Sequence, residues 1–344
     1  MLIDRLIGSF SKDVAIDLGT ANTIVSIKGE GIVINEPSVV AVHSDKHGYG
    51  EILAIGREAK DMEGKTPHKI EIIRPMRDGI IADFEMTERM IRFFIEKAYK
   101  RKSLIRPRIM VCVPYGLTGV EKKAVKESAL AAGAREVYLI EEPMAAAIGA
   151  GLRTEEAKGN LVIDIGGGTT EIGVVSYGGL VISKSIRVAG DKFDTAISEY
   201  VRKKYNLLIG ERTAETIKIE IGSAYSLNEM LVYQVRGRDN VSGLLNTIDL
   251  TSEDVREAIK DQLKAIVNAL KDVLEKLPPD LSGDIIENGI VLTGGGALIR
   301  GLDKYISEIV RLPVWVAEEP LLCVARGTSK AMEDEKLLQE LAIN

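Results

Sequence analysis

Two short loops, each following an apolar strand that ends in aspartate, carry the residue types best suited to chemistry in this sequence. The first begins at Asp17 and the second at Asp164, and Thr23 and Thr170 occupy the same place in the two copies. A glycine turn after a strand points consecutive backbone N–H groups at one spot, which suits a phosphate group. The first loop alone is more often an ordinary turn, whereas the three consecutive glycines of the second are more specific to an anion. Two facing copies predict a clamp on the β- and γ-phosphates of one nucleotide.

The predicted clamp also has a place for a metal. Asp17 and Asp164 stand at strand ends, and Mg²⁺ prefers one or two carboxylates while keeping several waters. We therefore expect the two aspartates to share one hydrated Mg²⁺. The chain has no Gly-x-x-x-x-Gly-Lys-Ser/Thr motif, which excludes a P-loop enzyme. The residues expected at the phosphates are Gly19, Thr20, Ala21, Asn22 and Thr23 in the first loop, and Gly166, Gly167, Gly168 and Thr169 in the second.

A third glycine loop follows the strand pattern at residues 290–293 and comprises Gly294, Gly295, Gly296 and Ala297. Glycines at such a place let a planar ligand, for example a base with its ribose, approach the backbone closely. A helix N-terminus that needs conformational freedom explains the same residues equally well. The spacing alone leaves both interpretations open.

Glu142 stands where a predicted strand ends and a helix opens with Pro143, a residue favoured in a first helical turn. Carboxylates at a helix N-terminus are usually favourable capping charges, and spacing alone favours that role. The alternative is that Glu142 points into a cleft and orients a water for attack on a γ-phosphate.

Between these motifs, strand and helix patterns alternate. Apolar residues recur at helical spacing over residues 86–101, 119–133 and 253–276. Shorter segments predict strands over 109–113 and 136–140 and a helix over 143–151. The alternation predicts an α/β architecture with a largely parallel sheet in each of two similar halves. Residues 227–249 are polar and glycine-bearing, which predicts an exposed hairpin or loop.

The composition narrows the class of protein. A formal charge of −6 gives no reason to expect nucleic acid as a partner. Cys112 and Cys323 have no metal-ligand spacing and fit a reducing, cytoplasmic setting. No run of about 18 apolar residues occurs, and the N-terminus lacks the apolar region and cleavage site of a secretory signal. We therefore expect a cytoplasmic protein of two or three domains.

The three loops resemble the phosphate-1, phosphate-2 and adenosine motifs of the actin, sugar-kinase and heat-shock chaperone superfamily. Four further segments, at residues 33–39, 73–79, 140–149 and 209–215, resemble the MreB family of bacterial actins. The resemblance implies an actin-like ATPase fold, α/β in class, with two similar RNase H-like domains around a nucleotide cleft. The implied subdomains are IA (1–38, 75–155 and 322–344), IB (39–74), IIA (156–190 and 253–321) and IIB (191–252).

The resemblance also implies a function. Members of this family bind ATP or ADP with Mg²⁺, hydrolyse ATP weakly, and polymerise into antiparallel double filaments on the inner face of the cytoplasmic membrane. Such filaments organise peptidoglycan synthesis through membrane-anchored cell-elongation proteins and so maintain cell shape. By motif, Glu142 takes the place of the water-orienting carboxylate. The segment implied to close over ribose and base is Glu215, Thr216, Ile217 and Lys218, where Thr216 replaces the arginine more usual in the family.

Two apolar segments are candidates for membrane contact. An N-terminal helix of about ten residues would be marginal in water but can fold on an interface. A basic stretch at residues 100–108 encloses two apolar residues and would be attracted to anionic lipid. Judged alone, the first is more often a frayed terminus, but the resemblance favours an anchor. The residues expected to insert are Leu2, Ile3, Leu6, Ile7 and Phe10, with Leu104 and Ile105.

Other members of the superfamily remain as alternatives. A sugar or acetate kinase would need a carboxylate placed for a second substrate, and no motif for one is present. A chaperone ATPase would need a long C-terminal domain, whereas residues 328–344 read as one polar helix. A plasmid-segregation or magnetosome filament shares the fold but would match the four family segments less closely.

Overall fold

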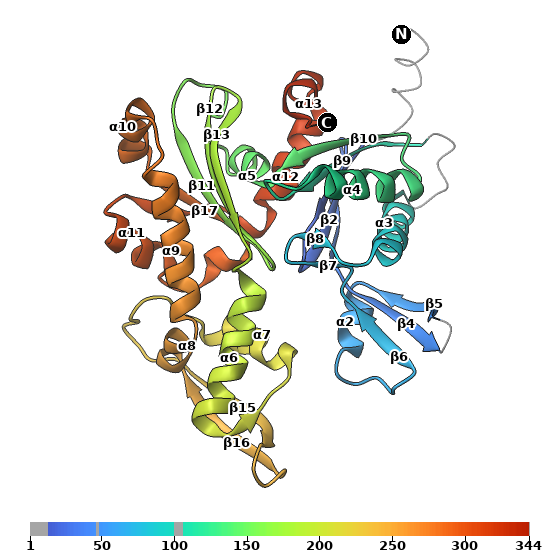
Figure 1. Cartoon of the computed structure of the whole chain (residues 1–344), viewed down its shortest axis with the longest axis vertical. Coiled ribbons are helices and arrows are strands. Elements are labelled where there is room, and N and C mark those ends of the chain that lie inside the picture. Colours follow the sequence, from blue (N-terminus) through green and yellow to red (C-terminus); the bar gives the residue numbers. More distant parts are fainter. Residues whose placement is uncertain (1–12, 46–47, 100–105, 344) are drawn as a thin grey trace.

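The computed structural model describes residues 13–45, 48–99 and 106–343. The chain forms two halves side by side, each with a large sheet at one end and a small sheet at the other (Figure 1). The membrane candidates Leu2, Ile3, Leu6, Ile7, Phe10, Leu104 and Ile105 lie outside the described residues. Among helices of the described part, none combines the length and apolar character needed to cross a bilayer.

The large sheets of the two halves have the same topology. The first has the order β10-β9-β1-β2-β3 and the second the order β13-β12-β11-β17-β18. In each, three consecutive strands pair antiparallel and two later strands join parallel to the first of them. The first sheet comprises β1 (Val14–Leu18), β2 (Asn22–Ile27), β3 (Gly31–Pro37), β9 (Arg108–Val113) and β10 (Glu136–Glu141). The second comprises β11 (Asn160–Ile165), β12 (Thr170–Ser176), β13 (Gly179–Ile186), β17 (Ile290–Thr293) and β18 (Val314–Val316).

This repeat puts the two loops in equivalent places. Asp17 is the fourth residue of β1 and Asp164 the fifth of β11, and each lies beside a parallel neighbour, Cys112 and Thr293 respectively. The strands run in the interior of the protein, so their ends deliver the aspartates and glycine turns to the space between the halves.

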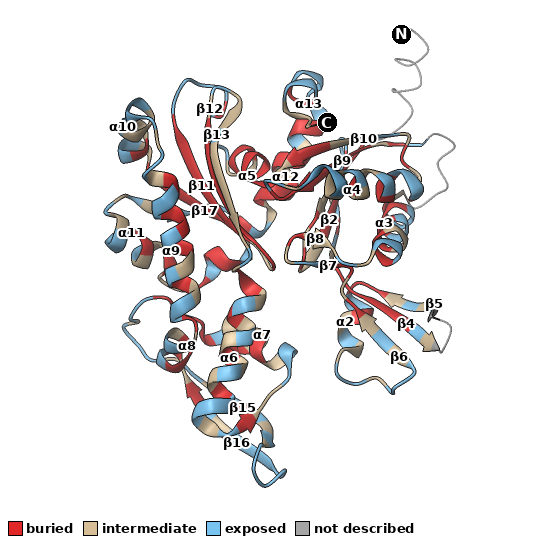
Figure 2. Cartoon of the chain, viewed as in Figure 1, coloured by how far each residue is buried: buried red, intermediate tan, exposed pale blue. Residues whose placement is uncertain are grey.

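Helices cover both sheets. Two of them, α5 (Glu142–Gly149) and α12 (Cys323–Glu333), pack against each other between the sheets (Figure 1). A mixed hydrophobic cluster around them takes Ala15 and Met110 from the first sheet and Val162 from the second. The outer helices are α3 (Phe84–Tyr99) and α4 (Gly119–Ala131) on the first half, and α9 (Lys260–Leu274), α10 (Pro279–Asn288) and α11 (Leu302–Val310) on the second. Figure 2 shows the resulting buried centre.

The small sheets stand at the far ends. One contains β4 (Val40–Asp45), β5 (Gly48–Ile55) and β6 (Ile70–Ile73), flanked by α2 (Arg57–Met62). The other contains β14 (Leu207–Leu208), β15 (Val232–Asp239) and β16 (Leu245–Thr251), with α6 (Gly190–Tyr205), α7 (Glu211–Ile221) and α8 (Ser252–Ala258). The exposed hairpin predicted over residues 227–249 is β15–β16. The remaining elements are β7 (Met76–Arg77), β8 (Ile80–Ile81), the 3₁₀ turns η1 (Gly295–Leu298) and η2 (Pro320–Leu322), and α13 (Glu335–Leu341).

Two predicted helices were wrong in detail. The helix predicted over 253–276 is divided at Ile259, which is fully buried, into α8 and α9. Both pieces bury the same apolar face, so the periodicity runs through the break. The C-terminal residues form two helices instead of one polar helix. Helix α12 is largely buried because it packs against the first large sheet and α5.

Candidate functional site

A cleft of about 960 Å³ lies between the halves, and both phosphate-type loops line it. Lining residues from the predicted set are Asp17, Gly19, Thr20, Ala21, Asn22, Glu142, Asp164, Gly166, Gly167, Gly168, Thr169, Glu215, Lys218, Gly294, Gly295 and Gly296. Four predicted residues do not line it. They are Thr23, Thr216, Ile217 and Ala297.

The two loops touch each other across the cleft floor. A Cβ on Gly167 would lie 2.7 Å from the Cβ of Ala21, and one on Gly168 would lie 2.5 Å from Thr20 Oγ1. These distances are shorter than real Cβ contacts, so only glycine lets the loops approach this closely. Thr20 Oγ1 also accepts a hydrogen bond of 3.1 Å from the Gly79 amide. The loops therefore form one continuous surface of backbone and hydroxyl groups.

Acidic side chains gather beneath this surface. Burial and the nearby Asp164 charge raise the pKa of Asp17 to about 7. Burial raises the pKa of Asp164 to about 6, opposed by a 2.7 Å hydrogen bond from Thr293 Oγ1. A pKa raised this far means that the ionised pair lacks compensating positive charge. The site is therefore electrostatically suited to a cation.

Glu142 belongs to the same acidic group. It is buried, lines the cleft and begins α5. Burial, then the charges of Glu171 and Asp164, raise its pKa well above the usual range. A carboxyl group in this setting is placed to take a proton from a bound water once positive charge is present. Among the two roles left open by the sequence, the cleft position favours the chemical one.

Glu171 is a further acid of this group, fully buried, that sequence reasoning missed. It follows the second loop on β12, and burial raises its pKa to about 8. Its carboxylate accepts hydrogen bonds from Ser185 Oγ (2.7 Å) and from the Tyr115 amide (3.4 Å). The available signal was a charged residue within the otherwise apolar run of residues 170–175.

The other end of the cleft is apolar. Ile219, Leu298 and Leu321 line it and leave 62%, 54% and 49% of their surface exposed. They lie with Gly294 and Gly295 in the cleft lining, and Gly294 is required to be glycine because a Cβ there would lie 2.4 Å from the Ile165 carbonyl oxygen. A flat, largely apolar group such as a nucleobase would cover these side chains. Ala297 instead packs in the core of the second half.

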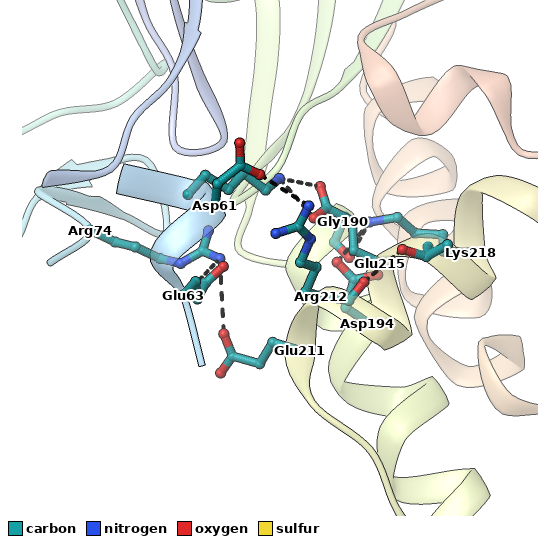
Figure 3. Close-up of polar contacts among 11 residues, drawn as sticks. Asp61, Glu63, Arg74, Gly190, Asp194, Glu211, Arg212, Glu215 and Lys218 are labelled. Carbon is teal, nitrogen blue, oxygen red and sulfur yellow. Dashed lines mark hydrogen bonds and ion pairs between the residues drawn. The ribbon is translucent and has the colours of Figure 1, made fainter. Parts of the chain in front are cut away.

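The segment from Glu215 to Lys218 divides between cleft and core. Lys218 Nζ pairs with Asp194 at 2.8 Å and donates to the Gly190 carbonyl at 3.1 Å (Figure 3). Ile217 points into the core, and Thr216 Oγ1 bonds to the Arg212 carbonyl at 2.9 Å. Helical periodicity explains the split, because only positions about one turn apart share a face. Thr23 is likewise buried, in a 2.9 Å hydroxyl contact with Ser38.

The donor set fits magnesium held by few protein ligands. Within the described residues, no group of three or more acidic, histidine or cysteine side chains is arranged to hold a metal by itself. Mg²⁺ characteristically takes one or two carboxylates and completes its shell with water and phosphate oxygens. Asp17 and Asp164, with raised pKa values beside a phosphate-type surface, match that pattern.

Comparison with known proteins agrees with this geometry. The cell shape-determining protein MreB of Escherichia coli K12 is 54% identical over 335 residues, covering 96% of each chain. The crystal structure of Spiroplasma citri MreB5 bound to ADP matches with a TM-score of 0.89 and 39% identity, covering 96% of this chain and 98% of that one. The same protein bound to AMPPNP matches with a TM-score of 0.88 at 38% identity, covering 96% and 97%. A MamK double helical filament, at 21% identity and a TM-score of 0.80, covers 94% and 99% and shares the fold.

These matches confirm the actin-like ATPase fold expected from the sequence. The model of the MreB/Mbl protein family matches residues 11–340, nearly the whole chain. This chain therefore belongs to the MreB/Mbl family of actin-like proteins.

Proposed function

We propose that this chain binds ATP with Mg²⁺ in the cleft, hydrolyses it slowly, and polymerises as a membrane-associated cytoskeletal protein. The observation that carries the proposal is the contact of the two glycine loops above the partly buried Asp17 and the buried Asp164. Backbone amides and the hydroxyls of Thr20 and Thr169 would hold the β- and γ-phosphates. The two aspartates would bind the waters of Mg²⁺, which neutralises phosphate charge when bound.

The chain supplies the rest of the reaction site. Glu142 would hold a water by hydrogen bond and accept its proton as the water attacks the γ-phosphate. The close loops would exclude other water and keep the phosphates in line. The base would rest on Ile219, Leu298 and Leu321, with Glu215 and Lys218 beside the ribose. Without the usual arginine at Thr216, base stacking would rest on these apolar side chains.

The proposed role in the cell is inferred from relatives that are named cell shape-determining proteins. Protomers would assemble into antiparallel double filaments on the inner face of the cytoplasmic membrane. Leu2, Ile3, Leu6, Ile7, Phe10, Leu104 and Ile105 would insert among anionic lipids. The filaments would organise peptidoglycan synthesis with membrane-anchored elongation proteins. We retain the division into subdomains IA, IB, IIA and IIB at the boundaries given above.

Light scattering tests this proposal. We expect scattering to rise when ATP and Mg²⁺ are added, and to rise further with vesicles containing anionic lipid. ADP with Mg²⁺, and ATP with a chelator, are the controls. A protein that stays monomeric in every condition, yet phosphorylates a small molecule, would instead be a kinase of the same superfamily.

A further inference from the structure

Two elements from opposite sides of the cleft meet at its mouth. Lys60, on α2 beside the first small sheet, reaches Glu215 on α7 beside the second, with Nζ 2.8 Å from Oε1 and 2.7 Å from Oε2. Both side chains are partly buried, with 23% and 30% of their surface exposed. The two residues are 155 positions apart, so this contact joins the far ends of the two halves.

Two further ion pairs extend the contact outward (Figure 3). Arg212 Nη2 lies 3.1 Å from Asp61 Oδ1. Asp61 follows Lys60 on α2, and Arg212 lies three positions before Glu215 on α7. Arg74 Nη2 bonds to Glu63 at 2.9 Å and lies 3.9 Å from Glu211 on α7. The charges alternate so that each basic group faces an acid across the gap. We call the pairs Lys60–Glu215 and Asp61–Arg212 the clasp.

The inner pair, Lys60 and Glu215, forms part of the cleft lining. Glu215 stands one helical turn before Lys218. Lys218 is held by Asp194 and the Gly190 carbonyl. Burial would raise the pKa of Glu215, but the hydrogen bond and charge of Lys60 outweigh it and hold the pKa below the usual value. The Glu215 carboxylate is thus kept ionised and oriented chiefly from the opposite side of the cleft.

We propose that Lys60 is a positioning residue for Glu215 at the nucleotide site, and that the clasp holds the mouth shut and retains the bound nucleotide. The inference rests on the proposed binding of ATP in the cleft. A nucleotide can leave only when α2 and α7 separate, which breaks both clasp pairs together. An exposed ion pair contributes little to the free energy of unfolding by itself. The clasp therefore affects the rate of nucleotide release more than the stability of the fold.

Charge reversal tests the clasp at its outer pair, which does not line the cleft. The measurement is the release rate of a fluorescent ATP analogue with Mg²⁺, chased by excess ATP. We expect Asp61→Arg and Arg212→Asp each to speed release about five-fold, because an attraction becomes a repulsion. The double variant should return to within about two-fold of wild type. Arg89→Glu on α3 is the matched control, because Arg89 pairs with Glu85 and neither lines the cleft, and it should leave release unchanged.

A second series tests the inner pair. Lys60→Met should speed release, and Lys60→Arg should restore it, because arginine keeps the charge while methionine keeps the length. Thermal unfolding of each variant without nucleotide should match wild type. The clasp is overturned if single reversals leave release unchanged, or if the double variant is no slower than the singles. If wild type fails to bind the analogue at all, the proposed binding of ATP in the cleft is wrong, and the proposed role of the clasp is wrong for that reason.

Discussion

Gly149 of α5 and Gly327 of α12 face each other where the two central helices cross. A Cβ on Gly149 would lie 1.7 Å from the Cys323 carbonyl oxygen, and one on Gly327 would lie 1.8 Å from the Ala145 carbonyl oxygen. Neither distance leaves room for any side chain. These helices pack in one hydrophobic cluster with residues of both large sheets, so the glycine pair allows the close crossing of α5 and α12 between the halves.

Gly327→Ala should therefore destabilise the protein. The added methyl meets backbone, which cannot move aside as a side chain can, and overpacking of this kind costs about 1–3 kcal/mol or more. We expect a melting temperature lower by about 1–4 °C or more. Gly119→Ala in α4 is the control, because a Cβ there meets nothing within 4 Å. Equal melting temperatures for wild type and Gly327→Ala would show that the crossing of α5 and α12 has room for a methyl group, and would contradict this account.

The acidic group predicts how stability depends on pH without nucleotide or metal. Asp17, Asp164 and Glu171 have native pKa values of about 7, about 6 and about 8, against 3.8, 3.8 and 4.5 as ordinary values. At pH values between the ordinary pKa and the native pKa of each group, the native state binds more protons than the unfolded state. In that range these groups therefore make the free energy of unfolding fall as the pH rises.

Glu171→Gln isolates one part of this effect. The amide is neutral at every pH, so the variant should match wild type below about pH 4.5. It should become progressively more stable than wild type between about pH 4.5 and about pH 8, and the difference should stay constant above that. Urea denaturation at several pH values in the presence of a chelator gives the comparison. A stability difference that does not change with pH would mean that Glu171 is not held protonated.

Glu142→Ala should slow phosphate release about 100-fold, because the water loses its proton acceptor, while ATP affinity changes little. Single-turnover hydrolysis and nucleotide titration measure the two effects separately. Glu141→Ala is the neighbouring control, since Glu141 precedes α5 and does not line the cleft. A parallel loss of affinity in Glu142→Ala would assign Glu142 a structural role.

Membrane binding is predicted from sequence alone. Deleting residues 1–10 should weaken co-sedimentation with anionic vesicles, since the apolar residues predicted from sequence to insert are removed. Changing Leu104 and Ile105 to serine in addition should weaken it further. Neutral vesicles and a Leu130→Ser variant, which alters an exposed leucine on α4, are the controls. Unchanged co-sedimentation of the combined variant would exclude both segments as anchors.

The two phosphate-type loops could be predicted because the residues that form each loop are close together in the sequence. The strand, aspartate and glycine turn of each loop lie within ten positions, and the repeat of this unit predicted two similar halves. Which of the residues from Glu215 to Lys218 face the cleft was harder to predict. The motif identifies only the segment, whereas the helical geometry determines which side chains point into the cleft. Thr216 and Ile217 turn away for that reason.

Features that depend on distant contacts could not be predicted. Glu171 is held by Tyr115 and Ser185, 56 and 14 positions away. A charge within the run of residues 170–175 was the one local signal, and it does not by itself show that the side chain is buried. The Lys60–Glu215 contact spans 155 positions and depends on how the halves close. The division between α8 and α9 at Ile259 follows from packing, since no glycine or proline marks it.

Binding of Mg²⁺ and ATP to wild type and Asp164→Ala, measured by titration calorimetry, tests the central claim most directly. Thr293 Oγ1 would lose its 2.7 Å partner in the variant, and the metal would lose one of its two carboxylates. We predict that wild type binds ATP tightly with Mg²⁺ and weakly with a chelator, and that the variant binds weakly in both conditions. Equal, metal-dependent affinities for the two proteins would contradict the assignment of the cleft as a Mg²⁺–ATP site.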